Sequence, residues 1–153
     1  EKLNGRPVVV GSGPCGLFCA LMLAENGYAP IVIERGGSVS ERIAAIEKFK
    51  KSRILDTDTN IQFGAGGAGT FSDGKLVTRI NDGMSAYVLE KFVEFGASEE
   101  ILFAAKPHIG TDILTTVIKS IRQEIIKLGG VVRFNTRLTD INIKNNKILL
   151  FFY

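Results

Sequence analysis

Residues 8–34, VVVGSGPCGLFCALMLAENGYAPIVIE, decide the fold of this chain. The apolar run VVV stops at Gly11, apolar residues then recur at helical spacing from Pro14 onward, and a second apolar run, IVI, ends at Glu34. Short apolar runs bounded by turn residues are typical of buried parallel strands. The order of strand, glycine-rich turn, helix and strand therefore predicts a right-handed βαβ unit.

The turn between the first strand and the helix reads GSGPCG, which follows the GxGxxG pattern of dinucleotide-binding turns. In that pattern Gly11 permits the tight turn, Gly13 leaves the backbone bare for a pyrophosphate, and Gly16 lets helix and strand pack closely. Pro14 and Cys15 open the helix, whose N-terminus presents free N–H groups and the positive end of its dipole to phosphates. These five residues form the candidate pyrophosphate site. The alternative is a glycine turn that only joins strand to helix.

Glu34 follows the second strand, at the position where dinucleotide-binding domains carry their ribose ligand. Its carboxylate is expected to accept hydrogen bonds from both ribose hydroxyls and to repel a 2′-phosphate, which disfavours NADP. Arg35 and Arg42 come next in the chain, and one of them is expected to neutralise pyrophosphate charge or to cover the adenine edge. The alternative for each is a solvated arginine, on a loop or on a surface helix.

A second glycine-rich segment, GAGGAGTFSDGK at residues 64–75, cannot form a core, but its backbone can wrap a flat ring or a phosphate. Thr70 and Ser72 supply hydroxyl groups there, and Lys75 places a cation where negative charge develops on a reduced flavin. The alternative is a flexible surface linker. The apolar Phe71 argues against a linker, because a free linker needs no apolar anchor.

The remaining patterns predict further helices and strands of an α/β domain. Ser38 with Glu41 three residues later is a capping box, which predicts a helix that runs to about Lys51. The other expected elements are a long ordered loop over 56–83, helices over 85–95 and 111–128, a strand over 131–134 and a hairpin that turns at 145–146. Thr111 or Asp112 is expected to cap the long helix.

Composition restricts the classes of function. A chain of 153 residues with 45% hydrophobic residues predicts one domain with a substantial core. The net charge of +3 is spread along the chain, which argues against nucleic acid as a partner, and no apolar run reaches the ~20 residues of a membrane span. Cys15 and Cys19 lie one helical turn apart, where a disulfide would close almost no loop. We therefore expect reduced thiols and a cytoplasmic protein.

The single histidine, His108, lies in the loop sequence KPHIG. It is either a proton donor near a flavin or a polar brace of the loop. No Cys or His stands near it in the sequence, so no metal site is expected. The sequence predicts no catalytic residue, substrate or oligomeric state.

The chain resembles the bacterial FAD-dependent dehydrogenases of unassigned substrate, which belong to the glutathione-reductase-like flavoproteins. The resemblance rests on residues 8–36, on the sequence NIQFG at 60–64 that leads into GGAGTFSDGKL at 66–76, and on KPHIGTD at 106–112. The glycine-rich second loop is its most specific part, because many FAD and NAD proteins share the first turn. The resemblance implies a Rossmann-like FAD/NAD(P)-binding domain with a parallel sheet, helices on both faces and a C-terminal β-hairpin.

The resemblance also implies an FAD site and an activity. FAD is the expected cofactor, NAD(P)H is a candidate electron donor, and the full protein is expected to be an FAD-dependent oxidoreductase. Glu34 holds the adenosine ribose in this scheme, and the backbone of Leu138 bonds the adenine. The other implied contacts are with the pyrophosphate, from Gly11, Gly13, Pro14, Cys15 and Gly16, and with the ribityl and isoalloxazine side, from Gly66, Gly67, Thr70 and Ser72.

Two departures from the family pattern affect these expectations. Ala65 stands where an acidic residue is usual. The flavoproteins are also much longer, so residues 1–153 are expected to be an incomplete FAD-binding domain that lacks the substrate domain and a C-terminal FAD segment. Two alternatives stay open, an NAD-binding dehydrogenase domain and a tRNA-modification-type or non-catalytic flavoprotein.

Overall fold

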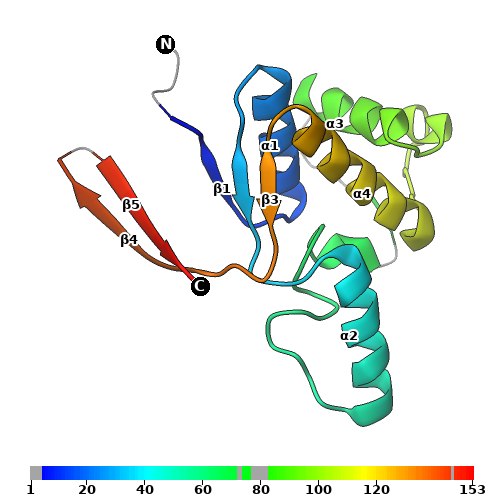
Figure 1. The fold of residues 1–153 in the computed structure, drawn as a ribbon. Helices are drawn as coiled ribbons and strands as arrows, with labels where there is room; N and C mark the ends of the chain where they lie inside the picture. The colour runs from blue at the N-terminus through cyan, green and yellow to red at the C-terminus, as the bar shows by residue number, and fades with distance from the viewer. Residues whose placement is uncertain (1–4, 72–73, 77–82, 146) are drawn as a thin grey trace.

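The computed structural model describes residues 5–71, 74–76, 83–145 and 147–153. Three short strands form a parallel sheet in the order β1-β2-β3. They span Val8–Val10 (β1), Ile31–Ile33 (β2) and Val131–Arg133 (β3), and Figure 1 shows them side by side. All three are rich in β-branched residues, which suit a buried pleated surface. The α/β class and the parallel sheet are confirmed.

Two helices cover the sheet on the face that carries Val9 and Val32. They are α1, Pro14–Glu25, and α4, Thr111–Lys127. α1 opens with Pro at its first position, as the sequence predicts, and α4 presents a stripe whose central side chains, such as Ile121, are fully buried. The two helices also pack on each other, so one core lies between them and the sheet.

The opposite face of the sheet is unevenly buried among the described residues. Val8 is 39% exposed and Val10 is 56% exposed, whereas Ile33, the register partner of Val10, is 2% exposed. The strand residues that alternate with Val9 point away from α1 and α4, which is why their apolar side chains meet solvent.

Two further helices lie beyond the sheet. α2, Val39–Ser52, begins with the predicted capping box, in which Ser38 Oγ accepts from the Glu41 amide and the Glu41 carboxylate accepts from the Ser38 amide. α3, Gly83–Glu94, packs near α1, and an ion pair of 2.6 Å joins Lys91 Nζ to Glu25 Oε1. In Figure 1, α3 and α4 lie on the same side of the sheet as α1, and α2 lies at its lower end.

The C-terminal hairpin is confirmed. β4, Leu138–Lys144, pairs antiparallel with β5, Lys147–Phe152, and lies on the far side of β1 from the helices (Figure 1). Short 3₁₀ helices occur at Ala68–Phe71 (η1) and Glu99–Leu102 (η2). The expected cap of α4 at Thr111 or Asp112 is wrong, because the N-cap is Gly110 and no side chain caps it.

Candidate functional site

The first glycine turn connects β1 to α1 and has the backbone that its pattern requires. Gly11 has φ of +90°, a conformation that residues with a Cβ rarely adopt. A Cβ at Gly16 would overlap the carbonyl oxygen of Gly11, so the bare position is what lets the helix approach the strand. Both glycines therefore serve the fold itself.

Gly13 differs from these two glycines because nothing constrains it locally. It is the N-cap of α1 with φ of −67°, and a Cβ built there would meet no atom within 4 Å. No side chain caps this helix end, and the first turn continues with Pro14, Cys15 and Gly16. The N–H groups of a first helical turn have no partner within the helix. The N-terminus of α1 thus offers donors and a positive dipole end beside open space.

Glu34 lies at the end of β2 and is 6% exposed. Its Oε2 accepts from the Ser12 amide at 2.7 Å and from Ser12 Oγ at 2.9 Å, and its Oε1 accepts from the Gly36 amide at 2.9 Å. The carboxylate therefore joins the glycine turn to the chain that leaves β2. A carboxylate has about four acceptor positions, so these three bonds leave about one for a ligand.

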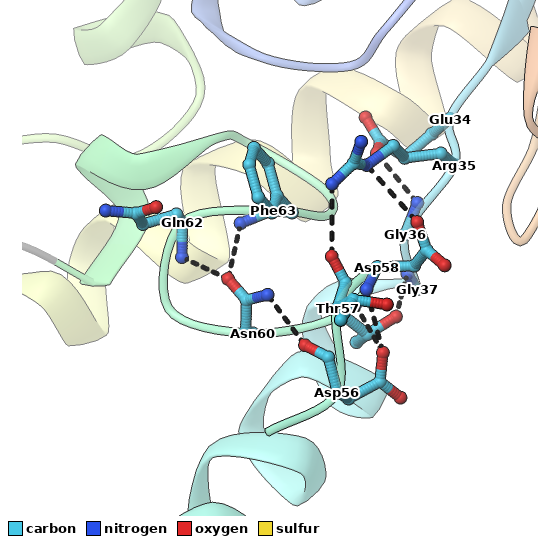
Figure 2. A network of polar contacts seen from close by, with 11 residues as sticks. Glu34, Arg35, Gly36, Gly37, Asp56, Thr57, Asp58, Asn60, Gln62 and Phe63 are labelled. Carbon is cyan, nitrogen blue, oxygen red and sulfur yellow. Dashed lines mark hydrogen bonds and ion pairs between the residues drawn. The ribbon is translucent and has the colours of Figure 1, made fainter.

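Arg35 lies on a network that links the end of β2 to the loop after α2 (Figure 2). Its guanidinium stacks 4.0 Å from the ring centroid of Phe63, Nη2 donates to the Thr57 carbonyl at 3.0 Å, and Nε is 3.4 Å from Asp58 Oδ1. Asn60 Oδ1 accepts from the amides of Gln62 and Phe63, which shapes the same loop. The stacked pair of Arg35 and Phe63 forms a flat, cationic wall.

Arg42 is fully buried, so its interpretation as a solvated arginine is wrong. Its guanidinium donates to the carbonyls of Asn60 at 3.0 Å and Ile61 at 2.9 Å. It also donates to those of Ala65 at 2.6 Å and Gly67 at 2.8 Å. Burial lowers the pKa of Arg42 to about 10, against the opposing effect of the Glu34 charge, and the group remains a cation at neutral pH.

These bonds make Arg42 the residue that fixes the second glycine-rich loop onto α2. The ring of Phe71 adds a contact, because its centroid lies 4.5 Å from the guanidinium carbon. The four carbonyls come from residues 60–67, so one side chain holds the backbone of that whole stretch in place. The alternative of a flexible surface linker is therefore wrong for this stretch.

The second loop packs directly on the first turn. The Gly66 amide donates to the Ser12 carbonyl at 2.8 Å, and Gly67 has φ of +69°. A Cβ at Gly67 would lie 3.0 Å from Pro14 Cδ and 3.2 Å from Gly13 Cα, so the two turns are in close backbone contact. The arrangement joins residues that stand more than fifty positions apart in the chain.

The hydroxyl-bearing candidates of this loop have different outcomes. Thr70 is fully buried in η1, and its Oγ1 has no hydrogen-bond partner among the residues that the structure describes. Ser72 lies outside the described residues. Thr70 is thus a buried polar group close to the glycine loops, which is a position that calls for an acceptor or donor.

A cleft of about 380 Å³ lies where the first turn, the end of β2, the second loop and the start of β4 meet. This volume is in the range of small-molecule sites. Six residues of the predicted site line it: Gly11, Gly13, Glu34, Arg35, Gly67 and Leu138. The other lining residues were not predicted as ligands, and they are Val10, Ile33, Gln62, Phe63, Gly64, Thr136 and Arg137.

Several predicted site residues do not line this cleft. Pro14, Cys15 and Gly16 stand beside it in the first turn of α1, and Cys15 is an exposed free thiol. Gly66 faces a second cavity, which is also lined by Ser12. The role of Ser12 as a partner of Glu34 was missed because it occupies a variable position of the glycine pattern.

His108 is exposed and is held by its backbone. It forms an isolated antiparallel bridge with Lys75, and the Ile109 amide donates to the Gly74 carbonyl at 2.9 Å. Neither cavity has His108 in its lining. In the described part of the chain, no group of three or more His, Cys, Asp and Glu side chains gathers as metal ligands do.

Known proteins resemble this chain at several levels. A family model described as NAD(P)-binding Rossmann-like domain matches residues 9–80. An uncharacterized protein of Clostridium beijerinckii is 51% identical over 148 residues, which cover 97% of this chain and 28% of the relative. The chain thus spans less than a third of the length of that relative. Among the described helices, none is long and apolar enough to cross a membrane.

Solved structures share the architecture at low sequence identity. THI4 of Thermovibrio ammonificans superposes with a TM-score of 0.51 at 17% identity, over 95% of this chain and 45% of that chain. Aklavinone-11 hydroxylase, crystallised with FAD and aklavinone, gives a TM-score of 0.41 at 20% identity, over 95% of this chain and 28% of that chain. The THI4 likeness concerns the fold, which is a Rossmann-like arrangement.

Proposed function

We propose that this chain binds FAD through the ADP half of the cofactor and is the dinucleotide-binding domain of a longer flavin-dependent oxidoreductase. One observation carries the proposal. The cleft of about 380 Å³ is lined both by Gly13, beside an uncapped helix N-terminus, and by Glu34. A dinucleotide needs these two features, a phosphate cradle and a ribose acceptor, on neighbouring strand ends.

The residues of the cleft fit the parts of an ADP group. The pyrophosphate would lie against Gly13, where a Cβ would project into open space, and would accept from the first-turn amides of α1. The ribose would donate to the remaining acceptor position of Glu34. The adenine would lie between the stacked guanidinium of Arg35 and the backbone near Leu138, both of which line the cleft.

Beyond the ADP half, the second glycine loop is the surface that the flavin end would meet. Gly67 packs on the first turn and Thr70 carries a buried hydroxyl without a partner, so both would face the ribityl side. Bound FAD would supply hydride and electron transfer. The role of this chain would be to bind and orient the cofactor and to hold its phosphates away from water.

Two other functions remain as alternatives. NAD uses the same turn and the same acidic ribose ligand, and the matching family model is described as NAD(P)-binding. NADP is disfavoured, because the buried Glu34 carboxylate would face the 2′-phosphate. A tRNA-modification-type or non-catalytic flavoprotein would bind FAD in the same way but would not oxidise NAD(P)H.

The test is the identity of the cofactor that the full-length protein carries. The protein is purified without added cofactor, its absorption near ~450 nm is recorded, and the released nucleotide is identified by chromatography after denaturation. Stripped protein is then titrated with FAD, NAD and NADP. Stoichiometric FAD and tighter binding of FAD than of NAD support the proposal. Tighter binding of NAD, with no flavin, would establish the first alternative.

A second measurement separates the enzyme from the non-catalytic flavoprotein. If the protein carries FAD, the rate of NAD(P)H oxidation is measured with a general electron acceptor. Turnover supports an oxidoreductase that uses NAD(P)H as donor. Flavin binding without turnover, together with retention of tRNA on the protein, would favour the second alternative.

A further inference from the structure

A second cavity, of about 320 Å³, is lined by residues other than those of the cofactor cleft. The first turn contributes Ser12 and the second loop contributes Gly66 to this cavity, whereas Gly11, Gly13 and Gly67 line the cleft. The two spaces share no lining residue. The second cavity is therefore a separate space, and a ligand can occupy it whether or not the cleft holds a cofactor.

The floor of this cavity is apolar. Leu17 from α1, Val39 from α2, Ile118 from α4 and Val132 from β3 line it. Leu17, Val39 and Ile118 are each at most 6% exposed, so these side chains are packed and form a rigid surface. Such a floor removes the apolar part of a ligand from water.

The rim along α4 is cationic. Lys119 and Arg122 stand three residues apart on the helix and both line the cavity. Arg122 Nε is buried and has no hydrogen-bond partner in the described part of the chain. The Arg122 guanidinium carbon lies 5.6 Å from the ring centroid of Phe134. The ion pairs formed by the described residues include neither cation.

A buried guanidinium nitrogen without an acceptor is a costly arrangement, so a ligand that places an acceptor there would stabilise it. The first turn of α2 faces this rim, because Ser38 and Ser40 also line the cavity. Ser38 Oγ already accepts from the Glu41 amide, while the Ser40 side chain is exposed. The guanidinium fork suits a planar carboxylate or a phosphate, which it binds through two parallel hydrogen bonds.

We propose that this cavity binds a small organic anion, with its apolar body on the floor and its carboxylate or phosphate group on Arg122 and Lys119. The ligand class follows from the combination of the two surfaces. An inorganic anion would not use the floor, and a neutral apolar molecule would leave the buried guanidinium nitrogen without an acceptor.

The experiment measures binding of four probes to the full-length protein by calorimetry and by protein-observed NMR. Benzoate and phenyl phosphate carry both an apolar body and an anionic group, inorganic phosphate carries only the anion, and benzyl alcohol carries only the apolar body. Saturable binding of benzoate or phenyl phosphate, at least about tenfold tighter than of the other two probes, is the expected result. Equal binding of inorganic phosphate and phenyl phosphate would overturn the proposal, as would no binding of any probe.

Variants locate the site. Arg122→Gln should weaken binding of the organic anion at least about tenfold, and Arg122→Lys should recover part of the loss because it keeps the charge without the fork. Lys127→Gln is the matched control, since Lys127 lies on the same helix with its side chain 75% exposed and should leave binding unchanged. Thermal unfolding of each variant shows that it is folded. Unchanged binding in a folded Arg122→Gln protein contradicts the assignment.

Stripping or adding FAD distinguishes this proposal from the cofactor proposal. Anion binding that persists in flavin-free protein supports a separate site. If the anion instead competes with FAD at the Gly13 cleft, and Arg122→Gln has no effect, the anion site is wrong while the cofactor site stands.

Discussion

Replacing Gly13 with valine should separate cofactor binding from folding. Gly13 has φ of −67° and ψ of −180°, a conformation that valine adopts readily, and a Cβ there meets nothing within 4 Å. Fewer unfolded conformations are available to the variant, an effect worth about 0.4–1 kcal/mol when glycine becomes alanine at a compatible position. We therefore expect the unfolding free energy of the cofactor-free protein to stay within about 1 kcal/mol of the original, or to rise.

The same change should remove the place of the pyrophosphate. A valine side chain would project into the cleft and hold the phosphates away from the first-turn amides of α1. Each charge-assisted hydrogen bond lost costs about 1.5–3 kcal/mol. Loss of one such bond corresponds to roughly 10- to 150-fold weaker binding, and loss of two bonds multiplies the two factors.

The assay pairs an FAD titration, followed by flavin fluorescence, with urea unfolding of stripped protein. Gly83→Val is the matched control, because Gly83 also has open space around its missing Cβ but lies at the start of α3. Gly16→Val is the contrasting variant and should destabilise the fold itself, since its Cβ would overlap the Gly11 carbonyl. If Gly13→Val stays folded and binds FAD as tightly as the original protein, the phosphate does not lie at Gly13 and the reasoning is refuted.

Three further changes test the surrounding structure. Arg42→Met should lower the unfolding free energy, measured by urea denaturation, by at least about 3 kcal/mol, because buried carbonyls lose their donor. Lys51→Met is the control on the exposed side of α2 and should change the unfolding free energy by less than about 0.5 kcal/mol. Glu34→Ala should weaken FAD binding by roughly 1–3 kcal/mol. It should also reduce the unfolding free energy of the stripped protein, because the Ser12 and Gly36 amides lose their acceptor. If neither FAD affinity nor stability falls, the role of Glu34 is contradicted. Hydrogen bonds from the Ser38 side chain and backbone lower the pKa of Glu41 below its unfolded value of 4.5, so the stability that Glu41 contributes is present above pH 4.5 and is lost as the pH falls through the lower folded pKa. Glu41→Gln should therefore reduce the slope of the unfolding free energy against pH in that acid range. An unchanged slope would speak against the capping box as the source of this pH dependence.

Local patterns were sufficient wherever the physics is local. The capping box predicted the start of α2 because Ser38 and Glu41 bond each other across one helical turn. The glycine pattern predicted the turn at Gly11, whose positive φ excludes most other residues at that one position. The cap of α4 was mispredicted because Thr111 is a good capping residue by type, yet the chain bends one residue earlier, at Gly110.

The candidate site was predicted in part for the same reason. Glu34 and Gly13 belong to one βαβ unit, so their meeting follows from the order of elements along the chain. The pairing of Arg35 with Phe63 and the three bonds to the Glu34 carboxylate had no sequence signal, because residue type alone does not show which donor a carboxylate meets.

Local sequence features are enough to predict the βαβ unit and the bare backbone of its first turn, because strand runs, helical spacing and glycine positions act within a few residues of one another. Three features emerge from long-range packing alone: Arg42 is buried in the second loop, Gly66 donates to the Ser12 carbonyl, and a separate cavity opens beside Arg122. Each of these joins segments far apart in the chain. Their geometry depends on how helices and loops pack against the sheet, which no short stretch of sequence specifies.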